Sequence, residues 1–216
     1  MHVEHKKLDI TGVLLVGGES RRMGRNKAFL EIAGKPLLER NLEVMGSICN
    51  EVIISCRETD QYEGYTKQYQ VIADRIKNKG PLAGLCSILP LAKYEYIFMA
   101  ACDMPLLNRQ AIAYIYSQIE DYQLIYPYVW DRLHPLHAFY HQSILPVAEK
   151  HLQEDQLSLL DLPKGCRTKT PRVSELLAGN PTRELIEQSF LNVNTPLEWD
   201  RINEKLMREV SRNEKN

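Results

Sequence analysis

The feature that most constrains the fold is an apolar run that breaks abruptly into a glycine-rich, cationic loop. Residues 10–16 read ITGVLLV, and they are followed by GGESRRMGRNK, which ends at Lys27. The apolar run predicts a buried β-strand. The paired glycines Gly17 and Gly18 let the backbone turn at positive φ and let a ligand lie against the peptide units. This segment therefore predicts a strand that ends in a ligand-binding loop.

The charge of the loop indicates the kind of ligand. Its cations are Arg21, Arg22, Arg25 and Lys27. Backbone N–H donors beside fixed cations suit a polyphosphate whose charge changes during a reaction. The spacing is not that of a P-loop, because Ala28 follows Lys27 where a metal-binding hydroxyl is needed, nor that of a dinucleotide fingerprint, because the first two glycines are adjacent. Composition alone leaves a basic surface turn as the alternative.

The overall charge requires any anion site to be local. The 216 residues contain 27 basic and 28 acidic side chains, so no global field attracts nucleic acid or an anionic membrane. Five cysteines without a C-x-x-C pair favour reduced thiols over a disulfide framework or a zinc ribbon. The polar N-terminal residues show no signal peptide or membrane span. We therefore expect a cytoplasmic protein that binds neither nucleic acid nor membrane.

Strands alternate with amphipathic helices along the first half of the chain, which predicts an α/β fold with a mostly parallel, doubly wound sheet and right-handed crossovers. The strands are expected at 10–16, 51–56, 70–73 and 94–101, with a polar helical stretch at 59–68. Further on we expect an antiparallel excursion over 123–140, an irregular basic segment at 163–181, a last strand at 190–193, a closing helix and a frayed tail over 211–216.

Two aspartates follow predicted strands. Asp74 comes after the third strand and Asp103 after the fourth, and ligands gather at the carboxyl ends of the strands in such sheets. Mg²⁺ binds one or two protein carboxylates and completes its shell with water and phosphate oxygens, so Asp103 alone could hold it. The structural alternatives are that Asp103 caps the following helix and that Asp74 is a solvated loop acid.

Four motifs together resemble one family. Residues 14–28 are similar to the signature L-x-G-G-x-S-x-R-M-G-x-D-K-A of the molybdenum cofactor guanylyltransferases, the MobA-like nucleotidyltransferases. GPLAG after Asp74, CDMP around Asp103 and NVNTP at 192–196 are similar to later motifs of that family, in the same order. Val16 stands where the family usually has alanine, and Asn26 stands where it usually has aspartate.

The resemblance implies the fold and the site. It implies a single Rossmann-like domain of the nucleotide-diphospho-sugar transferase type over 1–216, with a nucleotide-binding half at about 8–107 and an acceptor-binding half at about 108–200. Asp103 would bind Mg²⁺, and Lys27 and Arg22 would act with it in catalysis. The implied nucleotide contacts are Leu14, Leu15, Val16, Gly17, Gly18, Lys27, Asp74 and Asp103. The family's contact after the second strand has no clear match in SCR at 55–57, where Arg57 is the candidate.

On the acceptor side the resemblance implies that Asn192 and Asn194 help complete the site, although sequence logic alone would make Asn194 an ordinary helix start. His134, His137 and His141 could suggest zinc, but strand alternation would place His134 on the face opposite the other two. A contact from His134 to the pterin is therefore the better hypothesis.

The implied reaction is transfer of GMP from GTP to the phosphate of molybdopterin, with the guanine dinucleotide cofactor and pyrophosphate as products. A protein that delivers the molybdenum cofactor is a conceivable partner. Two alternatives stay open at this point. One is a related nucleotidyltransferase that uses CTP or a sugar-phosphate acceptor. The other is a non-catalytic GTP-binding protein, which Asn26 and the irregular segment at 163–181 motivate.

Overall fold

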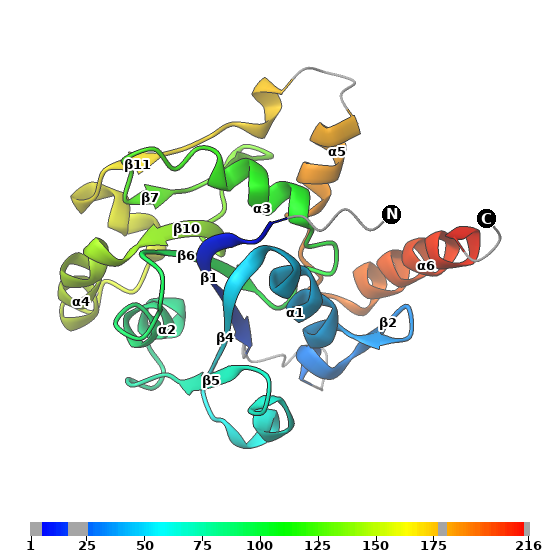
Figure 1. Cartoon of the computed structure of the whole chain (residues 1–216), viewed down its shortest axis with the longest axis horizontal. Helices are drawn as coiled ribbons and strands as arrows, with labels where there is room; N and C mark the ends of the chain where they lie inside the picture. The colour runs from blue at the N-terminus through cyan, green and yellow to red at the C-terminus, as the bar shows by residue number, and fades with distance from the viewer. Residues whose placement is uncertain (1–5, 17–25, 177–180, 214–216) are drawn as a thin grey trace.

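The structure, a computed structural model, describes residues 6–16, 26–176 and 181–213 (Figure 1). Its centre is a seven-stranded sheet with the order β11-β7-β10-β6-β1-β4-β5. The strands are β1 (Leu8–Val16), β4 (Cys49–Cys56), β5 (Gln70–Ala73), β6 (Tyr96–Ala101), β7 (Leu124–Ile125), β10 (His137–His141) and β11 (Thr168–Lys169). Strands β1, β4, β5 and β6 pair in parallel, whereas β10 runs antiparallel to both β6 and β7. The predicted α/β class and the antiparallel excursion are confirmed.

Strand β1 is an interior strand between β6 and β4 and is covered on both faces, as its continuous apolar sequence predicts. Leu14 and Val16 pack into the cluster that contains helix α1, whereas Val13 packs into the cluster that contains helix α2. Figure 1 shows these helices on opposite sides of the sheet. The α-helices are α1 (Leu37–Ile48), α2 (Gly80–Ile88), α3 (Arg109–Tyr116), α4 (Leu145–Gln153), α5 (Pro181–Gln188) and α6 (Pro196–Asn213).

Short elements connect the main ones. The 3₁₀ turns are η1 (Lys27–Phe29), η2 (Asp60–Tyr65), η3 (Gln142–Ile144), η4 (Leu159–Gly165) and η5 (Val173–Glu175). Two small hairpins pair β2 (Glu31–Ile32) with β3 (Lys35–Pro36) and β8 (Tyr128–Val129) with β9 (Arg132–Leu133). The helical stretch that the sequence predicts at 59–68 is thus the shorter 3₁₀ turn η2. Helix α6 runs to Asn213, past the point where fraying was expected.

The last strand predicted from the sequence, at 190–193, does not form. Phe190 and Leu191 instead donate their backbone N–H groups to the carbonyls of Glu187 and Gln188, which continues the end of helix α5 as a turn. Val193 donates to the carbonyl of Asp103. This segment is apolar because it packs into the core, and burial alone does not distinguish a strand from a buried turn.

The segment predicted to be irregular and basic contributes the edge strand β11, which pairs in parallel with β7. Its cations have partners: Arg167 pairs with Asp121 at 2.9 Å and Lys169 with Glu120 at 2.6 Å. The strand expected from 123 is divided into β7 and β8 around Pro127, which has no N–H to donate to a sheet ladder.

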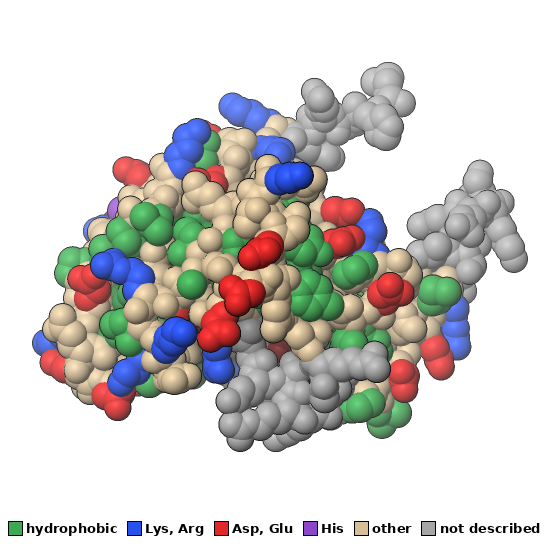
Figure 2. All heavy atoms as spheres, turned by 90° about the horizontal axis from the view of Figure 1, so that it is seen from below, with side chains coloured by type: hydrophobic (Ala, Val, Ile, Leu, Met, Phe, Trp, Pro, Cys, Tyr) green, Lys and Arg blue, Asp and Glu red, His purple; other side chains and the backbone are tan. Residues whose placement is uncertain are grey.

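The surface matches the near-zero net charge of the chain. Figure 2 shows acidic and basic side chains distributed among hydrophobic ones over one face. None of the helices within the described ranges has the length and apolar character that a membrane crossing needs.

Candidate active site

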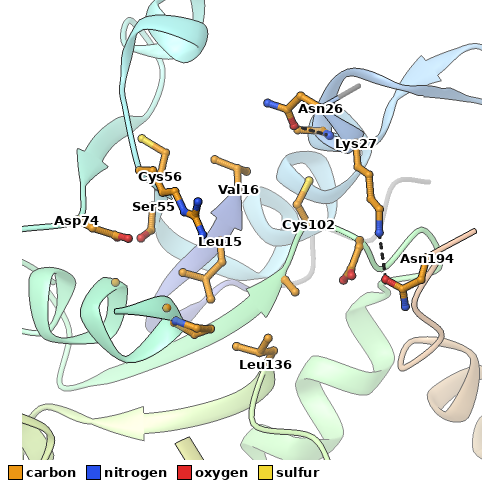
Figure 3. Close-up of a pocket in the computed structure, with 17 residues that line it drawn as sticks. Leu15, Val16, Asn26, Lys27, Ser55, Cys56, Asp74, Cys102, Leu136 and Asn194 are labelled. Atoms are coloured by element: carbon orange, nitrogen blue, oxygen red, sulfur yellow. Dashed lines mark hydrogen bonds between the residues drawn. The ribbon is translucent and has the colours of Figure 1, made fainter. Parts of the chain in front are cut away.

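A cavity of about 360 Å³ opens at the carboxyl ends of β1, β4, β5 and β6 (Figure 3). Its location follows from the topology, since parallel neighbours end at the same edge of a sheet. The sequence-predicted residues in its wall are Leu15, Val16, Lys27, Arg57, Asp74, Asp103 and Asn194. The structure therefore brings together side chains that are as far as 179 positions apart in the chain, from Leu15 to Asn194.

Asp103 lies in a loop that backbone contacts hold in place. The N–H of Cys102 donates to the carbonyl of Leu15 at 3.0 Å, and the side chain of Asn41 donates to the carbonyl of Cys102 at 3.0 Å. On the other side, the carbonyl of Asp103 accepts from Val193 at 2.9 Å. The carboxylate is thus presented in a fixed direction at the end of β6.

The carboxylate of Asp103 has unused acceptor capacity. Its Oδ1 is buried and has no hydrogen-bond partner among the residues that the structure describes. Burial raises the pKa of Asp103 above its ordinary value, and the ammonium of Lys27 opposes that rise. An acceptor left without a partner is costly, and a carboxylate oxygen at a strand end is a suitable ligand for Mg²⁺, which takes few protein ligands. Asp103 therefore fits the metal role that the family resemblance implies.

Lys27 spans the two halves of the chain. It follows β1 at the start of η1, and its Nζ donates to the carbonyl of Val193 at 2.8 Å and to Oδ1 of Asn194 at 3.0 Å (Figure 3). The segment 193–194 is therefore linked to the carboxyl edge of β1 by a cation that lies in the cavity wall. A charged donor in this position can bind phosphate oxygens.

The other wall is formed by Asp74 and the start of α2. The N–H of Asp74 donates to the carbonyl of Cys56 at 2.9 Å, which fixes the residue beyond β5. Burial raises the pKa of Asp74, and the guanidinium of Arg57 opposes the rise. Gly84 of α2 approaches closely: a Cβ on this residue would lie 3.0 Å from Oγ of Ser55 and 3.3 Å from Oδ1 of Asp74.

Ser55 is one of several lining residues that were not predicted as site residues from the sequence. It lies in β4, and its buried hydroxyl has no hydrogen-bond partner within the described part of the chain. Figure 3 shows that hydroxyl beside the carboxylate of Asp74. A signal existed, because a serine close to the end of the apolar run VIIS is where a parallel strand delivers a side chain to the ligand edge.

Other predicted site residues lie elsewhere. Leu14 is fully buried in the core beside the strand face that lines the cavity. Asn192 is not among the described residues that line the cavity, and its buried Oδ1 finds no hydrogen-bond partner among them. Gly17, Gly18 and Arg22 fall outside the described residues.

His134 is a core residue in the structure, and the predicted alternation of the histidines is wrong. His134 precedes β10 in a turn, so it has no fixed parity with His137, and both rings pack on Phe190, at 4.9 and 4.1 Å between ring centroids. Nε2 of His134 donates to the carbonyl of Val129 at 3.1 Å. Burial lowers the pKa of His134 to about 4 and that of His137 to about 3.

Comparison with known proteins agrees with this geometry. The chain is 31% identical over 194 residues to a probable molybdenum cofactor guanylyltransferase of Carboxydothermus hydrogenoformans, covering 90% of this chain and 95% of that protein. It is 32% identical to the molybdenum cofactor guanylyltransferase of Desulfosudis oleivorans, covering 89% and 93%. Its fold matches the crystal structure of molybdopterin-guanine dinucleotide biosynthesis protein A from Archaeoglobus fulgidus with a TM-score of 0.77 and 26% identity, covering 92% and 99%.

The mostly parallel sheet, the polar cavity at its carboxyl edge and these likenesses define the class of protein as an α/β nucleotidyltransferase. The model of the MobA-like NTP transferase domain matches residues 12–164. The chain belongs to this family.

Proposed function

We propose that the protein transfers GMP from GTP to the phosphate of molybdopterin, producing the guanine dinucleotide form of the cofactor and pyrophosphate. The observation that carries the proposal is the meeting of Lys27, Asp103 and Asn194 in one cavity wall between the two halves of the chain. The names of the relatives from Carboxydothermus hydrogenoformans and Desulfosudis oleivorans support the guanylyl donor and the acceptor.

The nucleotide would lie along the carboxyl ends of β1, β4 and β5. Leu15 and Val16 offer apolar wall, while Ser55 and Asp74 offer a hydroxyl and a carboxylate that can pair with donors and acceptors of a base or ribose. The family's nucleotide contact after the second strand has no clear match in the sequence, and we propose that Ser55 makes this contact. Gly17, Gly18 and Arg22 keep their proposed roles at the phosphates on the strength of the sequence resemblance.

Chemistry would take place on the acceptor side of Lys27. An oxygen of the acceptor phosphate attacks the α-phosphorus in line, the bond from that phosphorus to the bridging oxygen breaks, and pyrophosphate leaves. Lys27 would stabilise the charge on the departing group, and positioning by the cavity supplies the rest of the rate gain. Asp103 would hold Mg²⁺, which supplies Lewis-acid stabilisation of phosphate charge when bound.

Asn194 would contact the acceptor once Lys27 has engaged phosphate, and we keep Asn192 as an acceptor-side candidate. His134, which is buried, would support that side by packing on Phe190 rather than contact the acceptor itself. A cytoplasmic location is part of the proposal, supported by five free cysteines that fit a reducing compartment. A delivery protein for the molybdenum cofactor belongs to the proposal only as a partner to be sought.

The test is Asp103→Ala, assayed for pyrophosphate release from GTP with Mg²⁺ and molybdopterin. We expect Mg²⁺-dependent transfer to be abolished, and the unfolding free energy to be kept, because the change removes an acceptor that has no partner. Asp200→Ala, at an exposed position of α6, is the matched control and should leave turnover unchanged.

Normal turnover in Asp103→Ala would refute the metal role. Thermal shift with GTP, CTP and ATP then tests the base, since stabilisation by CTP alone would point to a cytidylyltransferase. Tight GTP binding without pyrophosphate release in the unmodified protein would instead indicate a non-catalytic GTP-binding protein.

A further inference from the structure

Asn26, where the chain departs from the family signature, makes three hydrogen bonds with its side chain. Oδ1 accepts from the backbone N–H of Ala28 at 3.1 Å, and Nδ2 donates to Oε1 of Gln61 at 2.7 Å and to the hydroxyl oxygen of Tyr62 at 3.1 Å. The orientation of the amide follows from chemistry, because a backbone N–H can only donate and therefore faces the oxygen. The amide of Asn26 has no idle donor hydrogen.

These partners tie two distant segments together around Lys27. Gln61 and Tyr62 belong to η2, which connects β4 to β5, whereas Asn26 caps η1. On the other side of Lys27, the ring of Phe29 stacks on that of Tyr62 with centroids 5.5 Å apart and an interplanar angle of 24°. Tyr62 is itself only 3% exposed, so it is a fixed support. The backbone of Lys27 is thus held on both sides by the same buried tyrosine.

The anchoring is relevant because Lys27 has a long side chain that works at a distance from its own backbone. Its Nζ reaches the carbonyl of Val193 and Oδ1 of Asn194 across the cavity (Figure 3). A lysine side chain has many rotamers, so the position of its backbone decides which atoms its ammonium can reach without a large loss of rotamer entropy. A loosened η1 would keep the ammonium charge in the cavity but let it occupy more positions.

We propose that Asn26 is a positioning residue for Lys27: its side chain attaches η1 to η2 and so directs the lysine ammonium at the phosphates of the nucleotide. The inference rests on the proposed function, because it takes Lys27 to be a phosphate contact. It also explains how asparagine can stand at this position. Gln61 can turn its amide and Tyr62 can donate its hydroxyl, so an amide or a carboxylate at residue 26 satisfies the same partners.

The test is a double-mutant cycle on the Kd of GTP in the presence of Mg²⁺, measured by isothermal titration calorimetry with the full chain. We expect Asn26→Ala to raise the Kd about tenfold, as for the loss of one or two hydrogen bonds, and Lys27→Ala to raise it roughly a hundredfold as a charged contact is lost. In the Lys27→Ala background, Asn26→Ala should change the Kd by less than about twofold, because its effect passes through the lysine.

Two further variants keep the test decisive if Asn26→Ala is poorly folded. Tyr62→Phe keeps the stack on Phe29 and removes only the hydroxyl, and it should raise the Kd about threefold. Asn26→Asp should recover the affinity to within about threefold of the unmodified protein through reversed hydrogen bonds. Asn50→Ala is the matched control, since Asn50 is exposed and its side chain donates to Oδ1 of Asp9, and it should leave the Kd unchanged.

Each opposite result overturns the proposal. Equal factors for Asn26→Ala with and without Lys27 would show that Asn26 acts on the nucleotide site as a whole rather than through the lysine. No rescue by Asn26→Asp would exclude positioning by these hydrogen bonds. If Lys27→Ala itself leaves the Kd of GTP unchanged, the failure lies in the proposed function of Lys27, which separates the two hypotheses.

Discussion

The two halves of the chain build their parts of the cavity in different ways. In the half up to residue 107, β1, β4, β5 and β6 are four to nine residues long and pair in parallel, so the side chains that follow them arrive at one edge. In the half from 108, β7 and β11 have only two residues each, and the described part of the segment 190–195 that reaches the cavity contains no strand.

The difference is one of support. Sheet hydrogen bonds hold the proposed nucleotide side. In the other half β10 is also held by the sheet, but the segment 190–195 is held by individual contacts: Phe190 packed against two buried histidines, Lys27 bonded to Asn194, and the cap of α6. Because these contacts are separate from the sheet ladder, the acceptor side should be the easier half to loosen without losing nucleotide binding.

The largest effect on stability is expected from Phe190→Ala. Phe190 is fully buried beneath the acceptor-side segment, and removal of its ring should lower the free energy of unfolding by about 3–5 kcal/mol. Urea unfolding measures this loss, and Phe190→Leu should cost less because it leaves a smaller cavity. If the two halves are supported separately, the folded fraction of Phe190→Ala should bind GTP with unchanged affinity. A loss of GTP affinity equal to the loss of acceptor binding would contradict the comparison.

A smaller effect, confined to the nucleotide side, is expected from Gly84→Ala. The added methyl would lie 3.2 Å from Cδ2 of Leu15 and 3.3 Å from Oδ1 of Asp74, so these groups must shift away from their places in the cavity wall. We expect the Kd of GTP to rise roughly tenfold, a change of about 1.4 kcal/mol. The higher helix propensity of alanine offsets the strain, so the free energy of unfolding should change by less than about 1 kcal/mol.

The control for this substitution lies in α1. A Cβ on Gly46 meets no atom within 4 Å, so Gly46→Ala should stabilise the protein by about 0.5–1 kcal/mol and leave GTP affinity unchanged. Calorimetric binding and urea unfolding of both variants separate propensity from crowding. Unchanged GTP affinity in Gly84→Ala would show that this wall adapts to a methyl group.

The smallest effect is expected at the cap of α6, from Glu198→Gln. Glu198 accepts from the backbone N–H groups of Asn194 and Thr195 at 2.8 and 3.0 Å, and Thr195 accepts in return from the N–H of Glu198, which is a capping box. The N–H of Asn194 holds the pKa of Glu198 below its ordinary value. The glutamine variant should melt slightly lower near neutral pH.

The sign of the pH dependence follows from that lowered pKa. The ionised carboxylate stabilises the fold above the ordinary glutamate pKa of about 4.3, and this contribution is lost as the pH falls through the lowered value. The difference in melting temperature between the unmodified protein and Glu198→Gln should therefore shrink in acid. Because the carboxylate is exposed, high salt should also reduce it. A difference that grows in acid would exclude this cap.

The contrast between the two halves of the chain also explains which site residues could be predicted from the sequence. Asp74, Asp103 and Lys27 were located at the cavity because each follows a parallel strand whose apolar sequence is unambiguous, and the register of parallel strands places their ends together. Leu14 was assigned to the site by its motif, but its side chain is fully buried in the core cluster that contains α1, two residues before the end of β1. Ser55 was missed, although it lies near the end of an apolar strand, because Arg57 was taken as the candidate from the same segment.

By itself, the sequence determined the parallel half of the sheet and the loop and aspartates at its edge, because hydrophobic periodicity and glycine placement act over a few residues. Only the tertiary structure decided that 190–193 is a turn, that His134 is buried on Phe190, and that Lys27 reaches Asn194. These contacts join residues far apart in the chain, and their free energy depends on which groups happen to meet in space rather than on any local pattern.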